Sequence, residues 1–142
     1  MHSLLIIPAV VWLVAQLLKL AFNLDREWRA NLKTLTTSGG MPSAHVAFVS
    51  ALATAVALRD GLNSDLFAVT AAFAAIVAYD AMGVRFASGE QAKAINRLVE
   101  RVLHGKRSEF DVLREELGHR PTEVAGGVLL GALLALIIYP LL

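Results

Sequence analysis

The sequence contains no cysteine and few charged residues, and both shortages limit what the protein can be. Without cysteine, disulfide bonds and thiolate chemistry are excluded, and the redox compartment is left undetermined. Asp, Glu, Lys and Arg make up 18% of the residues, whereas 56% are hydrophobic and the mean hydropathy is +0.59. Soluble domains are about 45–50% apolar. The composition therefore predicts a chain whose solvent is the membrane.

Other features are also absent. We find no internal repeat, no low-complexity linker and no separate soluble domain, so residues 1–142 are interpreted as a single membrane-embedded domain. No small-residue cleavage site follows the first apolar stretch, and Lys19 lies at its C-terminal end, which disfavours a signal peptide. The basic residues Arg97, Arg101, Lys106 and Arg107 are interleaved with Glu100, Glu109 and Asp111 and lack stacking aromatics. They favour lipid headgroups over nucleic acid as a partner.

Long apolar stretches are what the sequence does contain. The outer two approach the roughly 20 residues that cross a bilayer as a helix, whereas the middle two are shorter and are expected to be surrounded by protein. Small-residue faces at 51–55 and at Gly127 and Gly131 suit close helix packing in lipid. We predict an all-α membrane bundle of about four transmembrane helices, over approximately Leu4–Phe22, Ala44–Leu58, Leu66–Met82 and Val124–Leu142.

The distribution of charge predicts an orientation. Of the 13 Lys and Arg residues, all except Arg59 lie near the connection between the first and second stretches or that between the third and fourth. By the positive-inside rule these two connections are cytoplasmic. We therefore expect a protein of the cytoplasmic membrane with both termini on the outer side.

The third connection, from about Gly83 to Arg120, is long and patterned. Apolar residues recur at helical spacing from Ala92 to Leu103, with charged residues between them, and an apolar face resumes from Phe110 to Leu117. We predict two amphipathic cytoplasmic helices, lying on the membrane surface or packing over the bundle. The second connection, from Arg59 to Asp65, is typical of a tight turn.

Ionisable residues lie at the ends of the apolar stretches that share the predicted cytoplasmic face. Such groups at membrane depth are usually functional and paired with a partner. The topology is expected to bring together two imidazoles, two carboxylates and two cations, namely Lys19, His45, Asp80, Arg85, His119 and Glu123.

This set of residues suits phosphoryl transfer through a covalent intermediate. One neutral imidazole attacks phosphorus, a carboxylate orients it, and a second imidazole protonates the leaving oxygen. Lys and Arg balance the charge of the phosphate oxygens, and no metal or other cofactor is needed. Gly39 and Gly40, with Ser43 at a predicted helix start, add backbone and hydroxyl donors that suit an anion.

At this point two motifs resemble a known superfamily. Pro42-Ser43-Ala44-His45 is similar to the Pro-Ser-Gly-His motif of the type 2 phosphatidic acid phosphatase superfamily, which includes vanadium haloperoxidases. Gly118-His119-Arg120-Pro121-Thr122-Glu123 resembles its third motif, in which Asp follows the nucleophilic His by four positions. The segments Gly39–Ser43, Asp80–Arg85 and Gly89–Ala92 resemble its divergent bacterial and plastid branch more closely.

The resemblance implies a role for each matching residue. It implies His119 as nucleophile, Glu123 as its orienting carboxylate and His45 as general acid, with Ser43 and Lys19 binding phosphate. The chain departs from the superfamily at Ala44, which replaces Gly, at Glu123, which replaces Asp, and in its arginines. No Arg-Pro follows Lys19 at the spacing usual in the superfamily's first motif, and Leu113 stands where the third-motif Arg is usual. Arg85 is therefore favoured as the phosphate clamp, with Arg114 in reserve.

The resemblance implies a lipid phosphatase acting on phosphatidylglycerol phosphate, phosphatidate or polyprenyl phosphate. Vanadate is an expected inhibitor, and a homodimer is left open. One alternative is a transporter in which Asp80, His119 and Glu123 form a proton or cation site. Another is a silent member that binds lipid phosphate without turnover. Structural roles also remain open, with His119 and Glu123 capping a helix and Asp80 pairing with Arg85 or Lys19.

Overall fold

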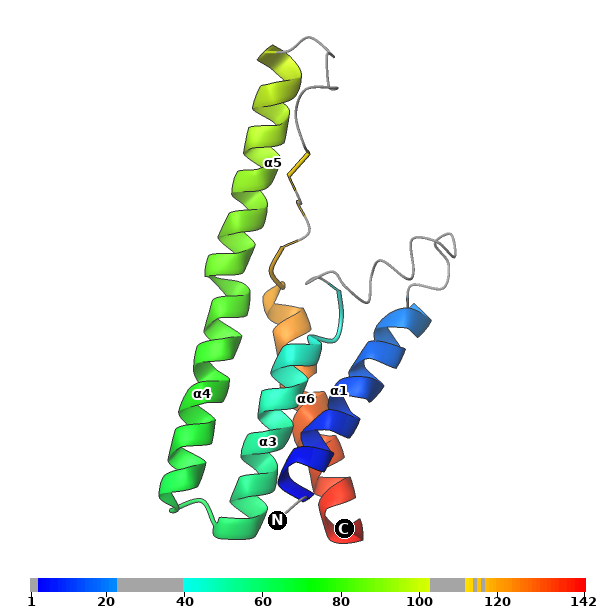
Figure 1. Ribbon diagram of the computed structural model, residues 1–142, viewed down its shortest axis with the longest axis vertical. Coiled ribbons are helices and arrows are strands. Elements are labelled where there is room, and N and C mark those ends of the chain that lie inside the picture. The colour runs from blue at the N-terminus through cyan, green and yellow to red at the C-terminus, as the bar shows by residue number, and fades with distance from the viewer. Residues whose placement is uncertain (1–2, 23–39, 103–111, 114, 116) are drawn as a thin grey trace.

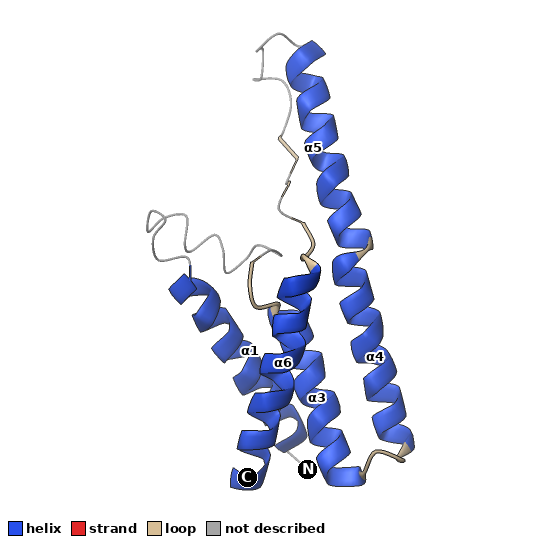
Figure 2. Cartoon of the chain, turned by 180° about the vertical axis from the view of Figure 1, so that it is seen from behind, coloured by secondary structure: helices blue, strands red, loops and turns tan. Residues whose placement is uncertain are grey.

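The structure is a computed structural model that describes residues 3–22, 40–102, 112–113, 115 and 117–142. Its described part consists of helices and connecting loops, without a strand (Figure 2). The elements are α1 (Ser3–Phe22), α3 (Ala44–Asp60), α4 (Asp65–Met82), α5 (Val84–Val102), α6 (Pro121–Ile138) and a short 3-10 turn, η2 (Tyr139–Leu141). The predicted all-α class is confirmed, and the four apolar stretches coincide with α1, α3, α4 and α6.

Helix α3 is the centre of the bundle. It packs against α1, α4 and α6, and both chain termini lie at the end of the bundle that carries the α3–α4 turn (Figure 1). The core is built from small and β-branched side chains, so the helices approach closely. Its buried members are Ile7, Val11 and Ala15 of α1, Ala44, Ala47, Ala51 and Ala55 of α3, and Ala135 of α6.

Two glycines bring α6 against the backbone of α3. A Cβ atom at Gly127 would lie 2.7 Å from the Ser43 carbonyl oxygen, and one at Gly131 would overlap the Ala47 carbonyl oxygen. The predicted Gly-containing packing face is therefore confirmed. Because this face is buried within one chain, it is not available as the contact surface of a homodimer.

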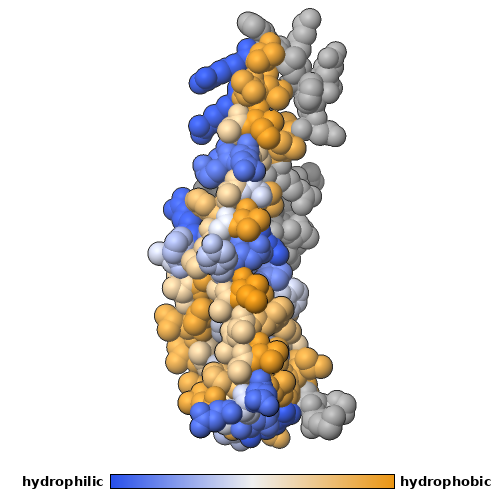
Figure 3. All heavy atoms as spheres, turned by 90° about the vertical axis from the view of Figure 1, so that its left-hand side faces the viewer, coloured by the Kyte–Doolittle hydropathy of each residue, from blue (hydrophilic) through white to orange (hydrophobic). Residues whose placement is uncertain are grey.

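Three helices in the described part are long and apolar enough to span a membrane: α1, α6 and the continuous α4–α5 segment. Helix α3, with 17 residues, is shorter and carries many buried residues, as expected of a protein-surrounded helix. The same expectation is wrong for α4, which buries Ala81 and leaves most of its other side chains partly or fully exposed. Apolar side chains cover this face of the bundle (Figure 3), so α4 is positioned to contact lipid.

Helix α5 continues the direction of α4 past a break at Gly83 (Figure 1). The combined 38 residues rise about 1.5 Å each, which is well beyond the roughly 30 Å of hydrocarbon. The amphipathic helix predicted from Ala92 is therefore present but longer, and it extends the bundle instead of lying across it. The second predicted helix, Phe110–Leu117, is wrong where the structure describes it, because 112, 113, 115 and 117 are non-helical.

Local signals place the ends of the central helices. Gly61, with φ +86°, and Ser64, whose hydroxyl accepts a hydrogen bond from the Phe67 amide at 3.2 Å, form the expected tight turn. Pro42 follows a cis peptide bond and precedes Ser43, the N-cap residue of α3.

Candidate active site

The loop that carries His119 is attached to the α4–α5 junction by its main chain. The His119 amide donates a hydrogen bond to the Ala81 carbonyl oxygen at 3.0 Å. Gly118 has φ +83°, and a Cβ atom there would overlap the backbone of Arg85 and Phe86. Only glycine fits both this conformation and this close approach. The sequence Gly118-His119 therefore fixes the imidazole beside the end of α4.

The second motif is joined to the first through another main-chain contact. The Ser43 amide donates to the Glu123 carbonyl oxygen at 3.1 Å, which links the start of α3 to the first turn of α6. Ser43 is the N-cap residue, yet its hydroxyl forms no capping hydrogen bond. The Oγ atom is fully buried and has no hydrogen-bond partner among the described residues. A buried hydroxyl without a hydrogen-bond partner is suited to bind a ligand.

Both motifs contribute to one cavity of about 550 Å³. This volume lies within the range of small-molecule sites. Its polar lining consists of Ser43, His45, Asp80, Arg85 and His119. The predicted convergence of the ends of α3, α4 and α6 is therefore present in the structure for these five residues.

His119 is the most deeply buried ionisable group of the cavity. It is 3% exposed, and neither Nδ1 nor Nε2 has a hydrogen-bond partner within the described part of the chain. Burial lowers its pKa to about 4, and the positive charges of Lys19, His45 and Arg85 contribute in the same direction. The imidazole is therefore neutral at physiological pH, the protonation state that a nucleophile requires.

Lys19 lies near His119 but does not line the cavity. Its side chain is buried in the last turn of α1, and its Cε atom is 3.6 Å from the position of a Cβ atom at Gly40. The ammonium group is close enough to interact electrostatically with His119 and with the Glu123 carboxylate. It contributes positive charge from the side of α1.

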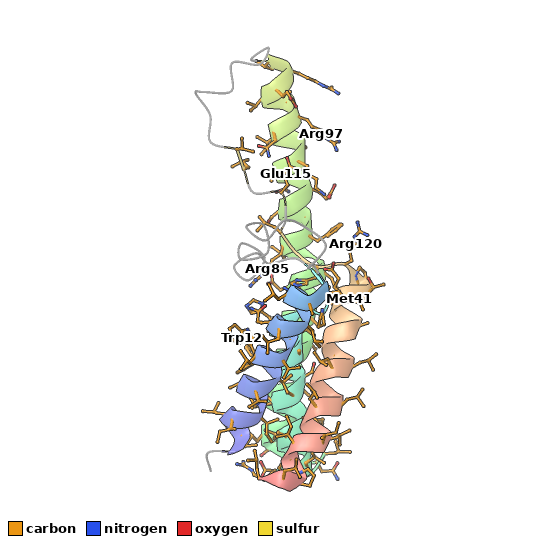
Figure 4. All side chains as sticks on the ribbon, turned by 90° about the vertical axis from the view of Figure 1, so that its right-hand side faces the viewer. Trp12, Met41, Arg85, Arg97, Glu115 and Arg120 are labelled. Carbon is orange, nitrogen blue, oxygen red and sulfur yellow. The ribbon has the colours of Figure 1, made fainter. Side chains whose placement is uncertain are left out.

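Asp80 and Arg85 form an ion pair at the cavity wall. The Arg85 Nε atom donates to Asp80 Oδ2 at 2.7 Å, across the break between α4 and α5. Of the structural partners considered for Asp80, Arg85 is therefore the one observed. Arg120, although adjacent to His119, is exposed and absent from the lining, and it lies on the other side of the bundle from Arg85 (Figure 4).

Glu123 does not make the contact that the motif implies. Its Oε2 atom accepts a hydrogen bond from the Arg120 amide at 3.1 Å, which caps the start of α6. The carboxylate is therefore bonded to the helix terminus, where an acidic side chain is favoured by the helix dipole. No hydrogen bond joins it to His119 within the described residues. The capping alternative describes its position in this structure.

Two of the predicted site residues, Gly39 and Arg114, lie outside the described residues. Gly40 is described, has φ +96° and adjoins Lys19. Within the described residues, no group of three or more His, Asp or Glu side chains is arranged to hold a metal ion.

Sequence reasoning missed the apolar wall of the cavity. This wall is formed by Trp12 of α1, Phe48 and Val49 of α3, and Phe73, Ile76 and Val77 of α4. A signal was present, because Phe73, Ile76 and Val77 precede Asp80 at helical spacing and so share its face. Trp12, Phe73 and Ile76 remain 40%, 52% and 66% exposed. The apolar wall therefore opens on the outer surface of the bundle.

Comparison with known proteins identifies the family of the chain. Residues 1–134 match the family described as "Divergent PAP2 family". The chain is 42% identical over 135 residues to "Uncharacterized membrane protein YuiD" of Bacillus subtilis (strain 168), covering 87% of this chain and 85% of the relative. No solved structure matches. The chain therefore belongs to the divergent PAP2 family of membrane proteins.

Proposed function

We propose that this protein is a membrane phosphatase that hydrolyses the phosphomonoester of a lipid through a phosphohistidine intermediate. The observation that carries the proposal is the cavity in which His119, His45, Ser43 and Arg85 meet beside an apolar wall. Membership of a PAP2-related family supports the same reaction class. The site thus combines the groups that phosphoryl transfer uses with a surface for a lipid tail.

The residues divide the reaction into two steps. A ring nitrogen of neutral His119 attacks phosphorus, a P–N bond forms, and the P–O bond to the lipid alcohol breaks as His45 donates a proton to the leaving oxygen. Water then attacks the phosphohistidine, His45 removes its proton, and inorganic phosphate leaves with His119 restored. Acid and base assistance of this kind contributes roughly 10²–10⁴-fold to such reactions.

The remaining polar groups would bind the phosphoryl oxygens. The Ser43 hydroxyl is buried without a partner, the Arg85 guanidinium lines the cavity, and Lys19 adds positive charge from α1. Fixed donors that face developing negative charge are a large contribution to catalysis in sites that exclude water. Glu123 is assigned a supporting role, because it caps α6 and lies near Lys19.

A lipid is favoured because the phosphate groups and the apolar wall belong to the same cavity. Trp12 and Ile76 would contact an acyl or prenyl chain that enters between α1 and α4. The starts of α3 and α6 lie at the end of the bundle opposite the termini (Figure 1), and the charge distribution favours the cytoplasmic side for that end. Phosphatidate, phosphatidylglycerol phosphate and polyprenyl phosphates are the substrates to examine.

The test is hydrolysis by the purified protein. In proteoliposomes, we expect phosphate release from at least one of these lipids, inhibition by vanadate and an acid-labile phosphoenzyme after a rapid quench. Vanadate mimics the trigonal-bipyramidal transition state, and such analogues bind about 10²–10⁸-fold more tightly than substrates. Turnover that is insensitive to vanadate and leaves no phosphoenzyme would exclude the phosphohistidine route.

The pH profile is a separate prediction. With the pKa of His119 lowered to about 4 from its ordinary 6.5, the nucleophile stays neutral as the pH falls through 6.5 and becomes protonated only near 4. The acid limb of kcat/KM is therefore expected near pH 4. Lys19→Met removes a positive charge that opposes protonation of His119, so the limb should move to higher pH. An acid limb at 6.5 in the wild type would contradict this assignment.

A second function is favoured by one observation, the position of Glu123. Because its carboxylate caps α6, His119 lacks the orienting acid that the superfamily motif implies. A protein that binds lipid phosphate without turnover fits this arrangement. It predicts saturable vanadate or phosphate binding with no phosphate release from any of the three lipid classes.

A further inference from the structure

We propose that Asp80 is a positioning residue, which holds Arg85 by Nε and thereby directs the outer edge of the guanidinium at the phosphoryl group. The inference rests on the proposed function and deepens it. It concerns the arginine, the part of the site for which the sequence offers no match to the superfamily motif.

The ion pair joins two residues that a continuous helix would keep apart. Asp80 and Arg85 are five positions apart, and side chains meet on a continuous α-helix at spacings of three or four. At about 100° per residue, five positions would place them roughly 140° apart around the axis. The break at Gly83, which has φ −96° and ψ −88°, changes this relation and allows the 2.7 Å contact.

The Asp80 carboxylate contacts the guanidinium of Arg85 at its Nε edge. Asp80 accepts a hydrogen bond from Nε, and no hydrogen bond of the Nη groups to another described residue is seen. A guanidinium offers five donors in a planar fork that suits phosphate. With Nε held by the carboxylate, the Nη1 and Nη2 groups remain for a ligand in the cavity that both residues line.

Main-chain contacts connect the chain around Arg85 to the segment that carries the nucleophile. Gly118 packs on the backbone of Arg85 and Phe86, and the His119 amide bonds to the Ala81 carbonyl oxygen. The residue that attacks phosphorus and the residue that holds its oxygens are thus attached to the same six-residue stretch of chain, residues 81–86. The hydrogen bond to Asp80 then constrains the direction of the Arg85 side chain.

Removing the Asp80 carboxylate tests the proposal, because a positioning role and simple charge repulsion predict opposite changes in vanadate binding. A negative charge that merely lined an anion site would repel phosphate, so Asp80→Asn would tighten the binding of vanadate. If Asp80 orients Arg85, the same substitution weakens vanadate binding and lowers kcat and kcat/KM together, by about 10-fold, as expected for an interaction made in the transition state. Tighter binding in Asp80→Asn would overturn the proposal.

A double-mutant cycle separates positioning from a structural role. We expect Arg85→Ala to lose about 10²–10³-fold in kcat, the range seen when an oxyanion donor is removed. Asp80→Asn should have no further effect in the Arg85→Ala background, because no guanidinium is left to orient. Added guanidinium ion should restore turnover to Arg85→Ala and much less to the Asp80→Asn, Arg85→Ala double variant. Independent effects, or equal rescue of both, would refute positioning.

The chain contains a matched control for these measurements. Arg59 and Asp60 form an ion pair of the same residue types and the same 2.7 Å length, at the end of the bundle remote from the cavity. Asp60→Asn should leave turnover and vanadate binding unchanged. Asp80→Glu, which keeps the carboxylate, should retain more activity than Asp80→Asn. Absence of lipid phosphate hydrolysis in the wild type would count against the proposed function alone, since vanadate binding still reports the effect of Asp80.

Discussion

Replacement of His119 by asparagine is expected to lower phosphate release by at least about 10³-fold, because loss of a nucleophile removes the covalent route altogether. The substitution keeps a planar polar side chain in a site that is 3% exposed, so the fold should persist. The measurement is phosphate release per purified protein, together with capture of the phosphoenzyme. Both should be lost.

The variant His45→Asn provides the comparison. A general acid matters most for a poor leaving group, so this variant should lose turnover of a lipid alcohol while an activated aryl phosphate still forms the phosphoenzyme. His119→Asn should fail with both substrates. Hydrolysis that persists at the wild-type rate in His119→Asn would refute the assignment of the nucleophile.

Replacement of Gly131 by alanine is expected to cause a large loss of stability. Its Cβ atom would overlap the Ala47 carbonyl oxygen and lie 2.9 Å from the Ser50 Cβ atom, so α3 and α6 would have to separate. Overpacking of this kind costs about 1–3 kcal/mol and sometimes more. Thermal unfolding in detergent, followed by far-ultraviolet circular dichroism, should show a clear decrease in Tm.

Gly126 offers the same substitution on the same helix with a different neighbour. A Cβ atom there would lie 3.2 Å from the Met41 Cε atom, the flexible end of a side chain that can move aside. Since alanine favours a helix over glycine by about 1 kcal/mol, Gly126→Ala should be neutral or stabilising. Equal Tm values for the two variants would show that the α3–α6 contact is not as close as described.

The helices could be predicted from the sequence because each has a clear start or end signal. Phe22 precedes a polar segment, Gly61 ends α3, and Pro121 begins α6, so hydropathy and turn residues coincide. The course of α5 could not be predicted in the same way. Gly83 suggested the end of a segment, but the helix resumes one residue later, and periodicity does not give the direction of the helix that follows.

The candidate site was predictable as far as the ends of helices determine it. His45 and His119 were expected at one end of the bundle because each begins an apolar stretch, and both line the cavity. The hydrogen bond made by Glu123 was not predictable, because a carboxylate three residues after Arg120 can cap the helix or reach the imidazole. That choice depends on side-chain rotamers. The apolar wall depends on how α1 and α4 face each other across α3.

The mixed lining of the cavity has a consequence for what happens after catalysis. Hydrolysis of a lipid phosphate yields one product that dissolves in water and one that dissolves in the bilayer. In the proposed reaction, a cavity with polar groups beside His119 and an apolar side with the exposed Trp12 and Ile76 would let the two products leave in different directions. The proposed reaction would thus release phosphate into water and the lipid alcohol into the bilayer. This separation opposes the reverse reaction and requires no conformational change.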